Sequence, residues 1–220
     1  MGADAQADER ARLVRGAAAL GVSMGDAEAI RLGRVLDELV RWNRTYNLTS
    51  IEGRDAMLTH HLLDSLSIAP HLAGRTVADV GTGAGFPGLP LAIVDPGRRY
   101  TLIDSNNKKI RFVAHVARTL GLGNVEPLQA RVEELQPAAP FDTVVARAFA
   151  PLPRLLAQVR GLCGPATRVL AMKSARLDEE LRELGPDWRL GKSVALQVPG
   201  LEAGRALAVL RLAGVSEGGR

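Results

Sequence analysis

From Arg75 onward, short apolar runs alternate with amphipathic stretches, and this alternation constrains the fold more than any other feature of the chain. A short apolar run that ends at a glycine or a charged residue is typical of a buried strand. The predicted strands are 76–80, 100–104, 124–129, 141–146 and 168–172, and the predicted helices are 89–94, 108–120, 152–162 and 177–184. Strands that alternate with helices predict a doubly wound α/β sheet with right-handed crossovers.

The last two predicted strands, 193–198 and 206–212, have no helix between them. Two strands that are joined without a crossover helix run antiparallel. The sequence therefore predicts a seven-stranded, mostly parallel sheet over 75–213, with 214–220 as a flexible tail. Ligands of such sheets bind at the carboxyl ends of the strands. The candidate binding loops are those after residues 80, 104, 129 and 146.

Residues 1–74 have a different pattern, which predicts a helical extension packed on the sheet domain. Asp26 is the predicted N-cap of one helix, because apolar residues recur at helical spacing from Ile30 to Trp42. The next segment, NRTYNLTS at 43–50, is a predicted polar loop. Asp55 is the predicted cap of a second helix.

Composition excludes several classes of protein. The chain is 46% apolar and 24% charged, as expected of a globular protein rather than a disordered one. It has no apolar run near the length of a membrane span and no signal peptide, so we expect a cytoplasmic protein. Cys163 is the only cysteine, and adjacent His60 and His61 point to different sides of a helix, so we expect no disulfide and no metal site.

The net charge of +4 is concentrated in the second part of the chain, since residues 76–220 hold 19 basic and 14 acidic side chains. This balance permits a partner with phosphates without requiring one. The chain has only four Phe, two Trp and two Tyr. So few aromatic residues argue against a surface built mainly on base stacking.

The first predicted strand runs directly into a glycine-rich loop, DVGTGAGFPG. Glycines there permit a tight turn and a close approach of a ligand to the backbone, although they could also serve the turn alone. The dinucleotide fingerprint fails because Phe86 stands where its third glycine belongs, and the Walker loop fails because it needs a lysine. An acidic residue followed by Gly81, Gly83 and Gly85 suits a nucleoside without a pyrophosphate, and S-adenosylmethionine is the common example.

Three later positions complete the predicted cofactor site. Asp104 ends the second strand, where a carboxylate can accept hydrogen bonds from ribose hydroxyls or cap the next helix. Val132 would contact an adenine ring held by backbone N–H groups, while Glu133 either joins it or only caps a helix. Arg147 ends the fourth strand and either pairs with a neighbour such as Glu133 or contacts the methionine carboxylate or the acceptor.

These motifs together resemble one family. The segments DVGTGAGFPG, YTLIDSNNKK, ARVEEL and VVARAFAPL follow one another as in the RsmG family, also called glucose-inhibited division protein B, and WNRTYNLTS and HHLLDSL fit upstream. The resemblance implies a class I, Rossmann-like methyltransferase that methylates N7 of a guanosine in the decoding-region loop of 16S ribosomal RNA. Its cofactor would be S-adenosylmethionine, with S-adenosylhomocysteine as product. The implied cofactor contacts are Gly81, Phe86, Val132, Glu133 and Arg147, with Asp104 at the ribose.

Guanine N7 has a lone pair in the ring plane and no hydrogen, so its methylation needs no general base. The enzyme must position the reactants and exclude water. We therefore expect Arg147 and Lys173 to act as positioning residues, and Asp64 is a candidate to stabilise the cationic product. Five residues are the candidates for contact with the RNA: Asn47, His61, Arg131, Lys173 and Arg205.

We expect a monomer whose partner is 16S ribosomal RNA or the assembling small subunit, with no membrane and no metal. Two other functions stay open. A small-molecule methyltransferase usually encloses its acceptor under a lid, for which this chain has no long insertion. A non-catalytic nucleotide-binding or RNA-binding module would not need the combination of glycine loop, Asp104 and Arg147.

Overall fold

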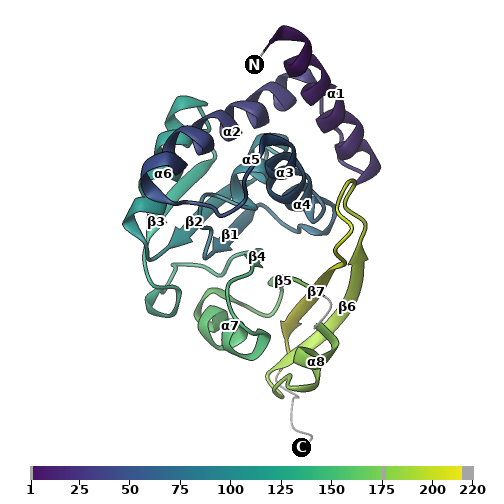
Figure 1. Ribbon diagram of the computed structural model, residues 1–220. Coiled ribbons are helices and arrows are strands. Elements are labelled where there is room, and N and C mark those ends of the chain that lie inside the picture. The colour runs from purple at the N-terminus through teal and green to yellow at the C-terminus, as the bar shows by residue number, and fades with distance from the viewer. Residues whose placement is uncertain (1, 175–176, 215–220) are drawn as a thin grey trace, which may run out of the picture.

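A seven-stranded sheet in the order β3-β2-β1-β4-β5-β7-β6 forms the centre of the computed structural model, which describes residues 2–174 and 177–214 (Figure 1). Its strands are β1 (Thr76–Val80), β2 (Arg99–Asp104), β3 (Val125–Gln129), β4 (Thr143–Arg147), β5 (Arg168–Lys173), β6 (Trp188–Leu196) and β7 (Arg205–Leu212). Strands β1 to β5 are parallel, and β7 is antiparallel to both β5 and β6. The predicted mostly parallel α/β fold is confirmed.

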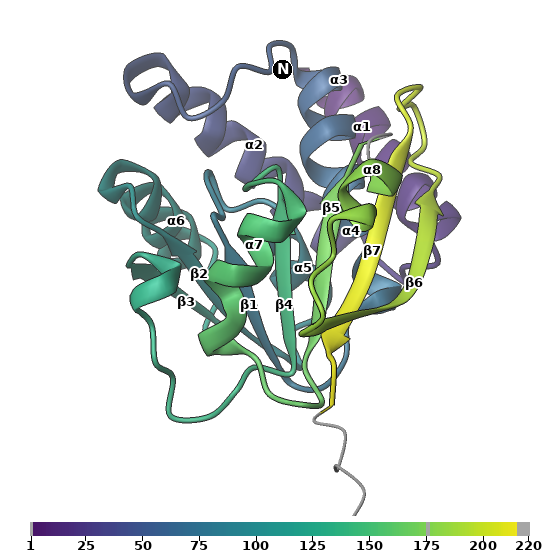
Figure 2. The same cartoon turned by 90° about the horizontal axis from the view of Figure 1, so that it is seen from below.

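The two faces of the sheet carry different helices (Figure 2). One face is covered by α5 (Gly88–Val94), α6 (Asn107–Thr119) and the N-terminal helices. The other face is covered by α7 (Leu152–Val159), the 3₁₀ turns η3 (Val132–Glu134) and η4 (Arg160–Leu162), and α8 (Leu177–Arg182). Successive strand residues point to opposite faces, so Val77 belongs to one apolar cluster and Ala78 to the other.

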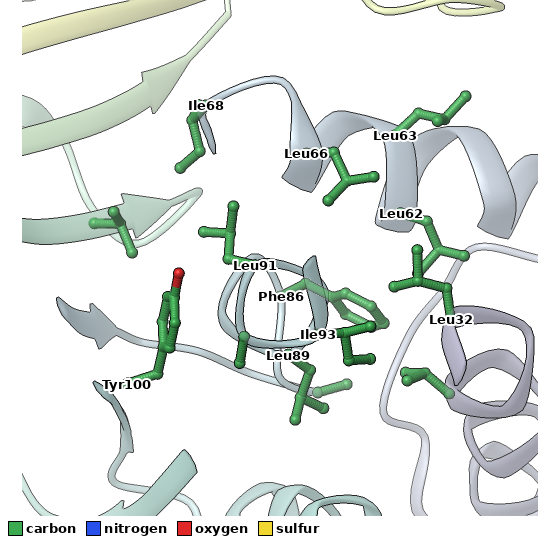
Figure 3. Packing of buried hydrophobic residues seen from close by; sticks show 14 of the residues in the cluster. Leu32, Leu62, Leu63, Leu66, Ile68, Phe86, Leu89, Leu91, Ile93 and Tyr100 are labelled. Carbon is green, nitrogen blue, oxygen red and sulfur yellow. The ribbon is translucent and has the colours of Figure 1, made fainter. Parts of the chain in front are cut away.

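The N-terminal helices share the larger apolar cluster with the sheet. They are α1 (Ala3–Ala19), α2 (Asp26–Tyr46), α3 (Arg54–Met57), the π-helical turn η1 (Leu58–Leu63), α4 (Asp64–Leu66) and the 3₁₀ turn η2 (Ala69–His71). Figure 3 shows Leu66 of this region near Leu91 of α5, while Leu62 lies farther along the same helical segment. All three side chains are fully buried. One continuous core therefore joins the segment before residue 75 to the sheet.

The structure corrects several local predictions. Gly25, not Asp26, is the N-cap of α2, and Gly53, not Asp55, precedes α3. Helix α2 runs to Tyr46, so the first half of the predicted 43–50 loop is helical. Asn43 closes the remaining turn, because its side chain both donates to and accepts from the backbone of Thr49.

Two further predictions differ near the edges of elements. Ile30, expected on the apolar stripe of α2, is 44% exposed. Strand β6 begins at Trp188 rather than at residue 193, and a β-bulge between Leu190 and Lys192 interrupts its polar first half. That first half lacks the apolar alternation on which the prediction depended. Of the predicted 214–220 tail, residues 215–220 lie outside the described part of the chain.

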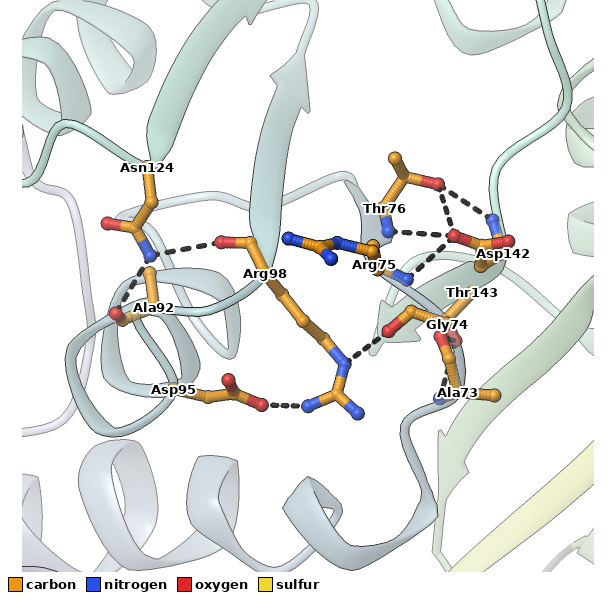
Figure 4. A network of polar contacts seen from close by, with 10 residues as sticks. All are labelled: Ala73, Gly74, Arg75, Thr76, Ala92, Asp95, Arg98, Asn124, Asp142 and Thr143. Carbon is orange, nitrogen blue, oxygen red and sulfur yellow. Dashed lines mark hydrogen bonds and ion pairs between the residues drawn. The ribbon is translucent and has the colours of Figure 1, made fainter.

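Hydrogen bonds close the edge of the sheet at which the parallel strands begin (Figure 4). The Asp142 carboxylate accepts from the backbone N–H groups of Arg75 and Thr76 and from the Thr76 hydroxyl, and these bonds lower the pKa of Asp142. Arg98 donates to Gly74 O and pairs with Asp95. The opposite edge, where the parallel strands end, is here called the carboxyl edge. Within residues 2–174 and 177–214, no helix is long and apolar enough to cross a bilayer.

Replacement of Leu66 by alanine tests the shared core. We expect Leu66→Ala to lower the free energy of unfolding by about 2–5 kcal/mol, because the side chain is fully buried. Ile30→Ala, at a position that is 44% exposed, should change it by less than about 1 kcal/mol. Urea denaturation of both variants gives the comparison. Equal losses in the two variants would contradict the shared core.

Candidate functional site

Two adjoining cavities open at the carboxyl edge, and both have Gly81 and Ala148 in their walls. The first cavity, of about 460 Å³, lies between this edge and the N-terminal helices. The lining of the first cavity includes His60, His61, Asp64, Phe86, Arg147, Lys173 and Arg205. The second cavity, of about 380 Å³, lies over the ends of β2 and β3. The lining of the second cavity includes Asp104, Arg131, Val132 and Glu133.

The glycine loop between β1 and α5 forms part of the wall of both cavities. Gly81, Gly83 and Gly85 have φ values of +66°, +60° and +84°. This left-handed region disfavours every residue with a side chain. A Cβ on Gly81 would lie 2.1 Å from the ring of Phe149, and a Cβ on Gly85 would lie 2.3 Å from Leu89. Only glycine therefore keeps this loop close to the strands and its backbone open to a ligand.

Asp79, the acidic residue before these glycines, fixes the loop through hydrogen bonds. Its side chain is fully buried, and Oδ2 accepts from the Thr82 hydroxyl at 2.6 Å and from Gly88 N at 2.8 Å. Oδ1 has no hydrogen-bond partner among the described residues. Burial raises the pKa of Asp79 to about 6. A Cβ on Gly88 would lie 2.7 Å from Oδ2, which explains the glycine at that position.

Asp104 lies at the wall of the second cavity with 8% of its surface exposed. Its Oδ2 accepts from Gly83 N at 3.0 Å, and its Oδ1 accepts from Asn106 N at 2.8 Å. The alternative role as cap of α6 is wrong, because Asn106 is the N-cap and accepts from Lys108 N. Each oxygen of a carboxylate has two acceptor positions, so Asp104 can accept from two further donors.

Val132 and Glu133 lie on η3, directly after β3. Val132 is buried, while the exposed carboxylate of Glu133 lies 3.4 Å from Nε2 of Gln158. Within the described chain, no side chain caps this turn, so Glu133 does not act as its cap. Glu133 is also not the partner of Arg147, whose guanidinium binds His60 O and Asp64 instead.

Arg147 turns from the end of β4 toward the N-terminal helices. Its Nη1 donates to His60 O at 2.7 Å and to Asp64 Oδ2 at 3.1 Å, and its guanidinium lies 5.6 Å from the centroid of the Phe86 ring. The other oxygen of Asp64 accepts from Nε of Arg205 at 3.1 Å. One buried carboxylate thus joins the last residue of β4 to the first residue of β7.

His61 lies flat on Phe86, with ring centroids 4.5 Å apart and an interplanar angle of 9°. Its Nε2 is 2.9 Å from the Thr49 hydroxyl, and its Nδ1 is 3.5 Å from Nη2 of Arg147. A guanidinium only donates, so Nδ1 faces it as an acceptor and Nε2 carries the hydrogen. Burial, and then the charge of Arg147, lowers the pKa of His61 to about 4. The ring is therefore neutral at physiological pH.

Lys173 lines the first cavity, but its ammonium points into the loop between β4 and α7. Nζ donates to Ala150 O at 2.6 Å and to Glu180 Oε2 at 2.7 Å, and 11% of the side chain is exposed. The same Glu180 oxygen accepts from Leu152 N. Lys173 and Glu180 therefore fasten the loop that carries Ala148.

Ala148 and Phe149 are cavity residues that sequence reasoning missed. Ala148 has a φ of +49°, which is uncommon for a residue with a side chain, and it belongs to the walls of both cavities. The ring of Phe149 lies over Gly81. Both residues belong to the ARAFA segment, in which Arg147 was the only predicted site residue.

Three residues that were singled out from the sequence lie away from the first cavity. Asn47 is exposed at the end of α2, where it has a φ of +49°, and its neighbour Leu48 lines the cavity instead. Arg131 borders the second cavity, is 67% exposed and lies 3.9 Å from Glu134. Cys163 directly follows η4, and burial raises its pKa to about 12. Among residues 2–174 and 177–214, no three His, Cys, Asp or Glu side chains gather as a metal site would require.

Comparison with known proteins identifies the family to which this arrangement belongs. A sequence model described as rRNA small subunit methyltransferase G matches residues 30–208. The chain belongs to this family. The ribosomal RNA small subunit methyltransferase G of Methylococcus capsulatus is 48% identical over 202 residues, which cover 92% of this chain and 98% of the relative. That of Stutzerimonas stutzeri is 46% identical over 201 residues, which cover 90% and 94%.

Solved structures support the fold assignment alone. A SAM-dependent methyltransferase from Aquifex aeolicus superimposes with a TM-score of 0.56 at 18% identity, over 75% of this chain and 97% of that one. The B. subtilis M1A22 tRNA methyltransferase TrmK also has a TM-score of 0.56, at 13% identity, over 68% and 65% of the two chains. This family member therefore has the class I methyltransferase fold.

The buried His61 makes stability depend on pH. Its pKa of about 4 lies below the ordinary 6.5, so the unfolded chain binds more protons between these values and stability falls as the pH falls through them. From pH 7 to pH 5, the wild type should lose about 2 kcal/mol more than His61→Gln. Asp79, whose pKa is raised, is present in both chains and cancels in the difference. Equal losses by chemical denaturation would show that His61 is not buried as a neutral ring.

Proposed function

We propose that this protein transfers a methyl group from S-adenosylmethionine to N7 of a guanosine in the decoding-region loop of 16S ribosomal RNA. One observation carries the proposal within this family. A nucleoside-sized cavity beside Asp104 adjoins a cavity lined by Arg147 and Arg205, and both share the wall formed by Gly81 and Ala148. A methyl donor in one cavity and an acceptor in the other would meet at that wall.

The residues of the second cavity fit the cofactor. Gly81 leaves the backbone without a side chain at the wall of this cavity, which permits close approach of a ligand. Asp104 is buried and retains acceptor positions for the two ribose hydroxyls, and Val132 offers an apolar surface to an adenine ring. Glu133 borders the same cavity and is the proposed polar contact. When it is bound there, S-adenosylmethionine supplies a methyl group on a positively charged sulfur.

The residues of the first cavity position the acceptor. Guanine N7 has no hydrogen to remove, so no side chain is required as a base. Phe86 and the neutral ring of His61 form a flat apolar stack, while Arg147 lies over Phe86 with its guanidinium fixed by two acceptors. Holding the acceptor in one orientation and away from water accounts for a large part of the rate acceleration in reactions of this kind.

Four residues are proposed to contact the RNA, and a fifth, Lys173, is proposed to position a loop beside it. Arg205 and His61 line the first cavity itself. Arg131 and Asn47 are exposed outside the first cavity, Arg131 at the border of the second cavity and Asn47 beside Leu48, and there they can contact neighbouring nucleotides. Lys173 acts through the Ala150 carbonyl that it holds, so it positions the loop between the cavities.

We further propose that the protein acts as a monomer in the cytoplasm, where 16S ribosomal RNA is transcribed and assembled. Residues 1–74 then serve as a helical extension that forms one wall of the acceptor side, and 75–213 serve as the methyltransferase domain.

Asp104→Asn tests the cofactor site. Removal of the carboxylate charge should weaken S-adenosylmethionine binding roughly 10–100-fold, because hydrogen bonds to charged groups contribute about 1.5–3 kcal/mol. Glu134→Gln, which removes an exposed carboxylate from η3, should leave the affinity unchanged. Titration calorimetry with S-adenosylmethionine and with NAD measures both. NAD binding without S-adenosylmethionine binding would refute the assignment.

Arg147→Ala tests the reaction. With S-adenosylmethionine and small subunits from cells that lack the gene, the wild type should methylate N7 of one guanosine in the decoding region, and chemical cleavage at N7-methylguanosine maps it. Loss of the fixed guanidinium should reduce the rate on the order of 100-fold. Arg118→Ala, at an exposed position on α6, is the control and should keep full activity. An unchanged cleavage map with the wild type would refute the proposed function.

A further inference from the structure

Asp64 is the only side chain in the first cavity that binds two cations from separate strands, as far as the described residues show. Its side chain is 2% exposed. Oδ2 accepts from Nη1 of Arg147, 83 residues later in the sequence, and Oδ1 accepts from Nε of Arg205, 141 residues later. Both distances are 3.1 Å. The charge of this carboxylate is thus balanced by two guanidinium groups, so little of it remains to stabilise a cationic guanine, the role predicted for Asp64.

The three side chains together carry an excess positive charge. One carboxylate faces two guanidinium groups, and within the described chain no other acidic side chain forms an ion pair with either. The arginine side chains are 20% and 25% exposed, so their charge is only partly screened by water. A cluster of this kind is suited to bind an anion that enters the cavity.

The two arginines differ in the donors that they leave available. Nη1 of Arg147 is occupied by His60 O and Asp64. Arg205 is held through Nε alone, and its two terminal amino groups donate to no atom of the described residues. A guanidinium that is anchored at Nε and open at its two amino groups has the geometry that binds two oxygens of a phosphate.

The position of Arg205 in the sheet indicates which anion it meets. It begins β7, and strands β4 and β5 lie between β7 and β1, from which the glycine loop leaves. Three strand spacings of about 4.8 Å place Arg205 about 14 Å from the start of that loop along the sheet. Arg205 therefore lines the first cavity across from the glycine loop, and it does not border the second cavity, where Asp104 lies. A phosphate of the RNA fits this position better than the carboxylate of the cofactor.

We propose that Asp64 is a positioning residue that aims both guanidinium groups, and that the open side of Arg205 binds a backbone phosphate next to the nucleotide being methylated. This inference rests on the proposed function. Asp64 fixes the phosphate-binding group on β7 relative to Arg147 on β4, and so sets where the guanine lies above the wall shared by the cavities. Asp64 itself touches neither substrate nor cofactor.

The proposal predicts a separation of rate from affinity. Asp64→Asn keeps the shape of the side chain but removes its charge, and its amide nitrogen turns a donor toward one of the arginines. The cavity then becomes more positive, so RNA affinity does not fall, while the arginines lose their fixed orientation. We expect kcat to fall on the order of 100-fold, with KM for the small subunit unchanged or lower. The Kd for S-adenosylmethionine should remain within about threefold of the wild type, that is, within about 0.7 kcal/mol.

Variants of Arg205 test the phosphate contact independently. Arg205→Gln should weaken RNA binding and reduce the slope of log affinity against log salt by about one, as expected for the loss of one phosphate contact. Arg205→Lys keeps the charge but lacks the guanidinium that Asp64 orients, so it should retain the salt slope and lose kcat. The double variant Asp64→Asn/Arg205→Gln should lose no more activity than the worse single variant, because the two residues act as one unit. Arg118→Ala, away from both cavities, is the control.

Steady-state kinetics on small subunits, calorimetry with S-adenosylmethionine and RNA binding over a salt series give these values. Unchanged kcat in Asp64→Asn would overturn the positioning role. An unchanged salt slope in Arg205→Gln, with weaker cofactor binding, would show that Arg205 binds the cofactor carboxylate instead. If Asp64→Asn does not fold, judged by circular dichroism, the two Arg205 variants decide the question. If the wild type does not methylate the RNA, the proposed function itself fails, which is a different result from a fully active Asp64→Asn.

Discussion

The packing of the 54–66 helical segment against α5 is the contact on which the site depends. Leu62 and Leu66 are fully buried in the same cluster as Leu91, so this segment cannot move away from the sheet without exposing a large apolar surface. The same segment carries His61 and Asp64 on its other side, facing the carboxyl edge. Hydrophobic burial on one side of a helix therefore fixes the polar geometry on the other.

The fold was largely predictable because its signals are local. Strands β1, β2, β4 and β5 are short runs bounded by turns, and each of these runs itself carries the apolar pattern. The glycine loop was equally predictable, since the positive φ at Gly81, Gly83 and Gly85 favours glycine, and each glycine can be recognised individually in the sequence. The prediction failed where a strand has no such pattern, as in the polar first half of β6, or where a helix ends without a strong signal, as α2 does at Tyr46.

The sequence predicted which residues belong to the site, but it did not predict the contacts between them. Arg147, Lys173 and Arg205 were named from their places at strand ends, and all three line the first cavity. The partners of the two arginines were not foreseen, because Asp64 lies 83 and 141 residues away from them. Nothing local in a sequence says which carboxylate a distant arginine will meet. The charge excess noted in the second part of the chain was also a poor guide, since part of it is neutralised by these pairs.

The ion pair between Asp64 and Arg205 has a consequence for the order in which the molecule is completed. The two residues are separated by 141 positions, and the chain is synthesised from Asp64 toward Arg205. At about 5–20 residues per second, roughly 7–30 s pass before the second arginine is added. The glycine loop and β1 to β5 are synthesised during that time, while Asp64 still lacks one of its two partners. The last strand to be made is therefore the one that closes the site.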